Sequence, residues 1–206
     1  MNDFNRKNHW ENIYQTKALN EVSWYQPLPQ TSLDFVAKFN LPLDAEIIDV
    51  GGGDSFFVDH LLKLGFQNIT VLDISEAAIS RAKERLGSDS ERVKWIVSDI
   101  TEFVPEEKYD FWHDRAVFHF LRAIEDQQSY LKVIDTAMES NGVLIIGTFS
   151  ENGPLKCSGI EIQQYSEHSL VQRFNEKFQK VESFKIDHST PFDTIQNFVF
   201  CSFRKV

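Results

Sequence analysis

Three aspartates in the first half of the chain follow runs of apolar residues, and each could accept hydrogen bonds from a ligand. Asp49 follows EII, Asp73 follows NITVL, and Asp99 follows RVKWIVS and precedes Ile100. The carboxyl ends of parallel strands meet at one sheet edge, where ligands bind in open α/β folds. Asp73 follows Asp49 at a spacing where its carboxylate could accept hydrogen bonds from both hydroxyls of an unphosphorylated ribose. Asp99 could accept from an adenine amino group, while its apolar neighbour Ile100 covers the ring. The three acids therefore predict a ligand that contains adenosine.

A glycine triplet, Gly51 to Gly53, lies between the first of these acids and an expected helix. Glycine allows a ligand to touch the backbone, and a helix N-terminus offers free N–H groups to a negative group. A dinucleotide fingerprint needs another glycine at position 56, where this chain has Phe56. S-adenosylmethionine (SAM), whose tail carries one carboxylate, suits this loop better than NAD. Ser55 could bond that carboxylate or cap the helix.

The elements that would position these residues alternate between strands and helices. Strands are predicted at 45–50, 68–74, 92–100, 109–114 and 142–149, the last after an Asn-Gly turn, with helices at 56–64, 75–87 and 125–139. Two more helices, at 6–19 and from Thr31, precede the first strand, and the runs 180–190 and 194–205 predict an antiparallel hairpin at the sheet edge. The expected fold is α/β: a three-layer, Rossmann-like, seven-stranded, mostly parallel sheet with an antiparallel last strand and helices on both faces.

Length and composition limit the possible functions. The 206 residues suit a single domain, and the net charge of −10 opposes binding to nucleic acid. The chain shows neither a leader nor a membrane-spanning run, so we expect a cytoplasmic protein without a membrane partner. Cys157 and Cys201 are expected to be reduced, and the cysteines and histidines show no metal-ligand spacing.

Four motifs in order, DVGGGDS, VLDIS, VSDI and YDFWHDRAVFHFL, resemble those of the class I SAM-dependent methyltransferases. The resemblance covers about residues 45–206 and implies a single domain, 1–206, with a SAM-binding core. It implies that Asp49, Gly51 and Gly53 hold the methionine part of the cofactor, Asp73 the ribose, and Asp99 with Ile100 the adenine. Gly52 and Ile74 belong to the same motifs and are included in the cofactor site. S-adenosylhomocysteine (SAH) would be the product.

A narrower resemblance begins upstream, at HWENIYQTKALNEVSWYQP. It is to small bacterial methyltransferases and, more distantly, to eukaryotic elongation-factor lysine methyltransferases. These have an aromatic pair where this chain has Trp24-Tyr25, and an acid-base pair where it has Asp114-Arg115. We expect the segment 1–44 to form a helical cap in which Trp24 and Tyr25 close over the cofactor, although both rings could instead staple the segment to the core.

Candidate catalytic residues lie at or just after the end of the fourth predicted strand, which faces the methyl group in this fold. Asp114, Arg115 and His119 are the candidates, with His113 as a further possible base. A base is needed only if the acceptor arrives protonated. The pair Asp114-Arg115 could be a plain salt bridge or a cofactor contact.

The acceptor is not fixed by the sequence: a small molecule or a protein, accepting at N, O or S, all remain open, as does a monomer or a dimer. Two alternatives to a methyltransferase are a SAM-binding module without catalytic activity and an NAD-dependent oxidoreductase.

Overall fold

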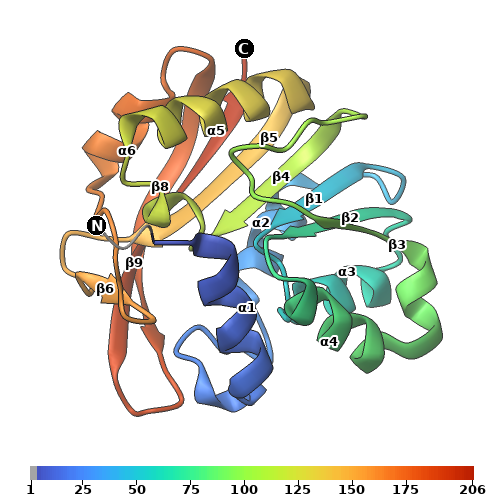
Figure 1. Ribbon diagram of the computed structural model, residues 1–206. Helices are drawn as coiled ribbons and strands as arrows, with labels where there is room; N and C mark the ends of the chain where they lie inside the picture. Colours follow the sequence, from blue (N-terminus) through green and yellow to red (C-terminus); the bar gives the residue numbers. More distant parts are fainter. Residues whose placement is uncertain (1–3) are drawn as a thin grey trace.

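A seven-stranded sheet forms the centre of the protein in the computed structural model, which describes residues 4–206 (Figure 1). The last strand in sequence, β9, runs antiparallel to both of its neighbours, and β1 to β5 are parallel. This arrangement confirms the predicted fold class and the predicted edge hairpin. The order across the sheet is β3 (Val93–Val97), β2 (Asn68–Asp73), β1 (Glu46–Val50), β4 (Tyr109–Arg115), β5 (Met138–Phe149), β9 (Ile195–Lys205) and β8 (Phe178–Ser189).

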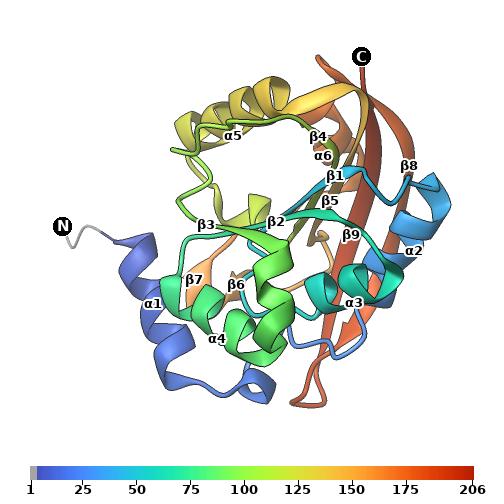
Figure 2. The same ribbon diagram turned by 90° about the vertical axis from the view of Figure 1, so that its right-hand side faces the viewer.

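Helices cover both faces of the sheet (Figure 2). One face carries α5 (Ile124–Ala137) and α6 (Glu167–Phe174), and the other carries α2 (Gln30–Phe39), α3 (Phe57–Leu64) and α4 (Glu76–Leu86). Successive strand residues point to opposite faces, so Ile48 belongs to the core beneath α5 and Ile47 to the core beneath α3. Burial on both faces explains why the central strands are almost entirely apolar.

Helix α4, which follows β2, begins and ends next to the two residues that the sequence predicted as its cap and its stop. Ser75 caps α4 by accepting from the backbone N–H of Ala78 at 3.1 Å, and Gly87 ends the helix with a positive φ of 58°. The helix therefore occupies the interior of the predicted segment 75–87.

Two stretches differ from the prediction. Strand β5 begins at Met138, where a helix was predicted to continue, because Met138 pairs with Tyr109 across an irregularity of the β4–β5 ladder. The predicted Asn-Gly turn therefore lies inside the strand, with Asn141 at φ 65°. Helix α6 and a small hairpin of β6 (Lys156–Cys157) and β7 (Ile160–Glu161) were not predicted.

The N-terminal segment lies at the edge where the parallel strands end. Helix α1 (Arg6–Thr16) is followed by a 3-10 turn, η1 (Leu19–Glu21), and packs beside α4 (Figures 1 and 2). Residues 1–3 of the predicted cap lie outside the described residues. From residue 4 onward, no helix is long and apolar enough to cross a membrane.

Candidate functional site

A cavity opens at the carboxyl ends of the parallel strands, beneath the N-terminal segment. Its empty space, counted together with the open solvent at its mouth, is about 1400 Å³. Of the predicted site residues it is lined by Trp24, Tyr25, Asp49, Gly51, Gly52, Ser55, Asp73, Ile74, Asp99, Ile100 and Arg115.

The glycine triplet allows two carboxylates to lie directly against the backbone. A Cβ at Gly52 would come within 2.5 Å of Asp49 Oδ2, and one at Gly53 within 2.5 Å of Asp73 Oδ2. Gly51 has φ 67°, and a Cβ there would collide with Val117. Gly53 does not line the cavity, so its role is to make room for Asp73.

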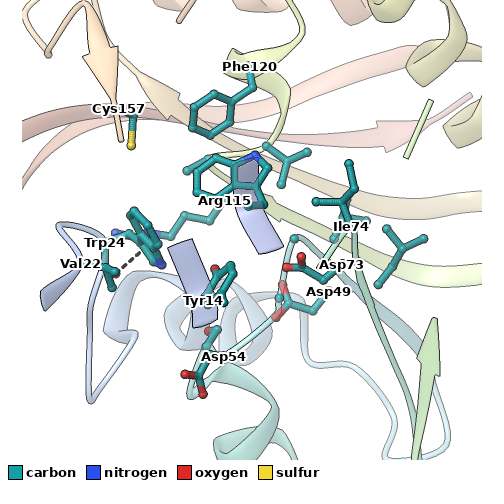
Figure 3. A pocket seen from close by; sticks show the side chains of 18 of the residues that line it. Tyr14, Val22, Trp24, Asp49, Asp54, Asp73, Ile74, Arg115, Phe120 and Cys157 are labelled. Carbon is teal, nitrogen blue, oxygen red and sulfur yellow. Dashed lines mark hydrogen bonds between the residues drawn. The ribbon is translucent and has the colours of Figure 1, made fainter. Parts of the chain in front are cut away.

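Asp73 is 5% exposed and receives a hydrogen bond on Oδ1 from the backbone N–H of Ser75 at 2.8 Å. Burial raises the pKa of this carboxyl to about 7, and the neighbouring charge of Asp49 adds to the rise. The carboxyl groups of Asp49 and Asp73 lie side by side in the cavity, with Ile74 next to them (Figure 3). A pair of ribose hydroxyls could donate to Asp73 in its ionised form.

Asp49 is held by a chain of hydrogen bonds. Its Oδ1 lies 2.7 Å from His113 Nδ1, and His113 Nε2 lies 2.8 Å from the hydroxyl of Ser32 on α2. Both ring nitrogens of His113 therefore have partners. The histidine also lines the cavity and orients a cofactor-side acid, and its role as a general base stays a prediction.

Asp99 lies two residues beyond the end of β3, in a turn rather than in the predicted strand. Its Oδ1 accepts from the backbone N–H and the hydroxyl of Thr101, and its Oδ2 pairs with Arg6 of α1 at 3.1 Å. Ile100 is buried beside it. The N-terminal helix therefore reaches the acid that was assigned to the adenine.

Ser55 and Phe56 organise the start of α3. The Ser55 hydroxyl accepts from the backbone N–H of Phe57 at 3.1 Å, as a cap would. The Phe56 ring packs against Tyr25 and under the guanidinium of Arg85. A bulky side chain therefore stands where a dinucleotide fingerprint has its third glycine.

Asp114 is not among the residues that line the cavity, and its assignment to the catalytic and cofactor-binding sets stays a prediction. It is fully buried, and its carboxylate accepts from the backbone N–H groups of Val117 and Phe118 and from the hydroxyl of Tyr130. Burial raises the pKa of this carboxyl to about 6. Asp114 forms no salt bridge with Arg115, because the two side chains leave strand β4 on opposite faces. Its role is to fix the turn after β4.

His119 also lies outside the cavity wall. Its Nδ1 accepts from the backbone N–H of Phe149 at 3.2 Å, and its ring packs between Phe120 and Phe149. Burial lowers the pKa of the imidazole to about 3, so it is neutral at physiological pH and a poor base. Its catalytic role stays a prediction, which neither its position nor its lowered pKa supports.

Trp24 and Tyr25 both line the cavity and both pack against the protein. Trp24 makes edge-to-face contacts with Trp10 and Tyr14 of α1, and its carbonyl accepts from Arg115 Nη1 at 3.2 Å. His188 binds the same segment through the Ser23 carbonyl. These contacts are compatible both with a lid that closes over the cofactor and with rings that only attach the N-terminal segment to the core.

The sequence did not single out several residues of the cavity wall. Phe120, Phe149 and Phe198 carry aromatic rings, Gln196 an amide and Cys157 a thiol. They come from β5, β9, a 3-10 turn, η3 (Phe118–Phe120), and the small hairpin, so no local motif joins them. Cys157 and Cys201 are both free thiols, and burial raises the pKa of Cys157 to about 11.

Comparison with known proteins gives one consistent result. The profile of a family described as "Methyltransferase domain" matches residues 44–198. A malonyl-[acyl-carrier protein] O-methyltransferase from Ilyobacter polytropus is 36% identical over 105 residues, which span 50% of this chain and 37% of that protein. The chain thus spans less than half the length of this relative.

A human protein, EEF1A lysine methyltransferase 2, is 22% identical over 191 residues, covering 85% of this chain and 75% of its own. Among solved structures, the N-methyltransferase NodS from Bradyrhizobium japonicum, in complex with S-adenosyl-l-homocysteine, has a TM-score of 0.71 at 14% identity. That match covers 98% of this chain and 99% of the other, and it shows a common fold.

The buried carboxyl of Asp73 makes cofactor binding depend on pH. If the ionised form accepts from the ribose, the affinity for SAH should fall by up to about tenfold per pH unit below its pKa of about 7. Asp73→Asn should weaken SAH binding about tenfold or more at neutral pH and remove this dependence. Calorimetry between about pH 6 and 8 measures both. A mutant with wild-type affinity would show that the ribose binds elsewhere.

The position of Asp114 predicts a loss of stability rather than of cofactor binding. Asp114→Ala leaves two backbone N–H groups and the Tyr130 hydroxyl without their acceptor, which should lower the free energy of unfolding by roughly 2–4 kcal/mol. Asp114→Asn, which keeps one acceptor oxygen, should lose less. Denaturant unfolding and SAH calorimetry separate the two effects, and a variant of normal stability that no longer binds SAH would restore Asp114 to the cofactor site.

Proposed function

The chain belongs to the methyltransferase domain family, and we propose that it transfers the methyl group of SAM to a small-molecule or protein acceptor. The observation that carries the proposal is the shape and charge of the cavity. Four carboxylates line the cavity: Asp49 and Asp73 at the ends of β1 and β2, Asp99 just beyond β3, and Asp54, which pairs with Arg81. An aromatic wall with a single arginine occupies the other side. One side suits an adenosine with an attached amino acid, and the other leaves room for an acceptor.

The glycine loop fits SAM, because the absence of side chains at Gly52 and Gly53 lets the carboxylates of Asp49 and Asp73 lie against the backbone, where they can accept hydrogen bonds from the cofactor. Asp73 would hold the ribose, Asp49 the amino group of the methionine part, and Asp99 with Ile74 and Ile100 the adenine. Bound there, SAM supplies a methyl group on a positively charged sulfur. The protein would contribute alignment of the acceptor and exclusion of water.

Proton removal by the protein is not part of the proposed mechanism. His113 has two hydrogen-bond partners, and Asp114 and His119 lie outside the cavity wall. We therefore favour an acceptor whose nucleophilic atom already has an available lone pair.

We also propose that the part of the predicted segment 1–44 that precedes α2 forms a cap over the core of residues 45–206, since α2 itself packs on a face of the sheet. Arg6 pairs with Asp99, and Glu11 of α1 accepts from the hydroxyl of Ser75 and the backbone N–H of Ala77. These contacts join α1 to the two turns that would hold adenine and ribose. Cofactor binding and docking of the cap would then stabilise each other.

The two alternatives have less support. Phe56 occupies the place where NAD binding requires a glycine, and the family profile is that of methyltransferases. A SAM-binding module without catalytic activity would not need the part of the cavity that lies between the cofactor and the aromatic wall.

Direct binding and turnover experiments test the proposed function. Calorimetry should show binding of SAM and SAH and no binding of NAD. Incubation with SAM labelled in its methyl group should transfer label to an acceptor from a metabolite extract or a cell lysate. Comparable or tighter binding of NAD would overturn the assignment, and SAM binding without transfer to any fraction would favour the silent module.

Removal of the cap distinguishes a lid from a staple. Deletion of residues 1–26 should leave a folded core with weakened SAH binding and no turnover, whereas a staple predicts a large fall in melting temperature. Trp24→Ala should lower turnover more than stability, and Trp10→Ala, whose residue packs against Trp24, is the matched control for aromatic packing. Normal kinetics in Trp24→Ala would argue against the lid.

A further inference from the structure

Arg115 is the one arginine of the cavity wall without an acidic partner among residues 4–206. Arg6 pairs with Asp99, and Arg81 pairs with Asp54. By contrast, Arg115 Nη1 donates to the Trp24 carbonyl, and its Nη2 has neither solvent contact nor a hydrogen-bond partner. A charged donor left in this state costs free energy, which an anion would offset.

The surroundings of the guanidinium keep it charged without neutralising it. Burial lowers the pKa of Arg115 to about 10, so the group stays cationic at physiological pH. Its Cζ lies 4.9 Å from the centre of the Phe198 ring, whose face favours a cation. The carboxylate of Asp114, the preceding residue, instead accepts hydrogen bonds from Val117, Phe118 and Tyr130.

The guanidinium points away from Asp73, although the charge of Asp49 still acts on it. In Figure 3, the Arg115 side chain extends toward Trp24 and away from Asp73. Phe198 belongs to β9, which is separated from β1 in the sheet by β4 and β5. The amide oxygen of Gln196, also on β9 and in the cavity wall, is buried without a partner as well. This side is therefore aromatic, with one cation and one amide.

We propose that Arg115 binds a carboxylate of the methyl acceptor, so that the substrate is a small anion with an apolar or aromatic body. This inference rests on the proposed function and narrows its acceptor. An arginine fork matches a carboxylate with two parallel hydrogen bonds, and aromatic walls accept the body of such a molecule. The same guanidinium donates to the Trp24 carbonyl, so a carboxylate bound to Arg115 would lie beside the proposed cap.

A carboxylate could also come from the amino-acid part of the cofactor, and the experiment separates the two sources. The probes are benzoate with its neutral isostere benzamide, and phenylacetate with phenylacetamide, titrated by calorimetry into the SAH-saturated protein. We expect each carboxylate to bind about tenfold or more tightly than its amide. In Arg115→Met this preference should disappear, while the affinity for SAH stays within about threefold of wild type.

Arg122→Met is the matched control, because Arg122 is exposed, pairs with Glu161 and lies outside the cavity. It should keep the preference for carboxylates. Arg115→Met should not lower the melting temperature, because it removes an unpaired buried charge. If it fails to fold, Arg115→Lys, which retains the charge but not the fork, should keep the preference in weaker form.

Equal binding of carboxylate and amide by the wild type, including no binding of either, would overturn the inference. So would an unchanged preference in Arg115→Met. A loss of SAH affinity of about tenfold in Arg115→Met would assign the guanidinium to the cofactor's carboxylate, and the methyltransferase proposal would stand. Failure of the wild type to bind SAH would refute the proposed function itself.

Discussion

The burial of two carboxylates side by side, Asp49 and Asp73, is the constraint on which this site depends. Each stands at the end of a central strand, and desolvation raises the pKa of Asp73 to about 7. The protein offsets this cost locally: His113 and Ser75 donate to the two acids, and two glycines let the backbone approach them. A ligand with hydroxyl and ammonium donors would complete the arrangement, because it would satisfy the remaining lone pairs of the carboxylates.

The opposite side of the cavity has the inverse electrostatics. One arginine lies among aromatic rings without an ion-pair partner among residues 4–206, and His113 and Asp114 are hydrogen-bonded within the protein. The cavity is thus divided into an acidic side and a cationic side, which suits a cationic cofactor and an anionic acceptor. The N-terminal segment joins the two sides, since Arg6 of α1 reaches Asp99 and the Trp24 carbonyl accepts from Arg115 in the far wall.

Sequence reasoning worked where function depends on a short motif. The order of strands, the Ser75 cap and the meeting of Asp49, Asp73 and Asp99 all follow from local pattern and from the rule for parallel sheets. It did not show that Arg115 rather than Asp114 faces the cavity, because residues alternate between the two faces of β4 and the sequence alone does not say which face carries the site. It did not predict the aromatic wall, because Phe120, Phe149 and Phe198 come from three separate elements that only the folded chain brings together.

A crystal structure of the SAH complex would test the central claim, the division of the cavity into two sides. The account predicts ribose hydroxyls within hydrogen-bonding distance of Asp73, adenine beside Ile74 and Ile100, and an Arg115 guanidinium that makes no contact with the carboxylate of SAH. A cofactor whose carboxylate lies on Arg115, or whose ribose lies away from Asp73, would contradict it.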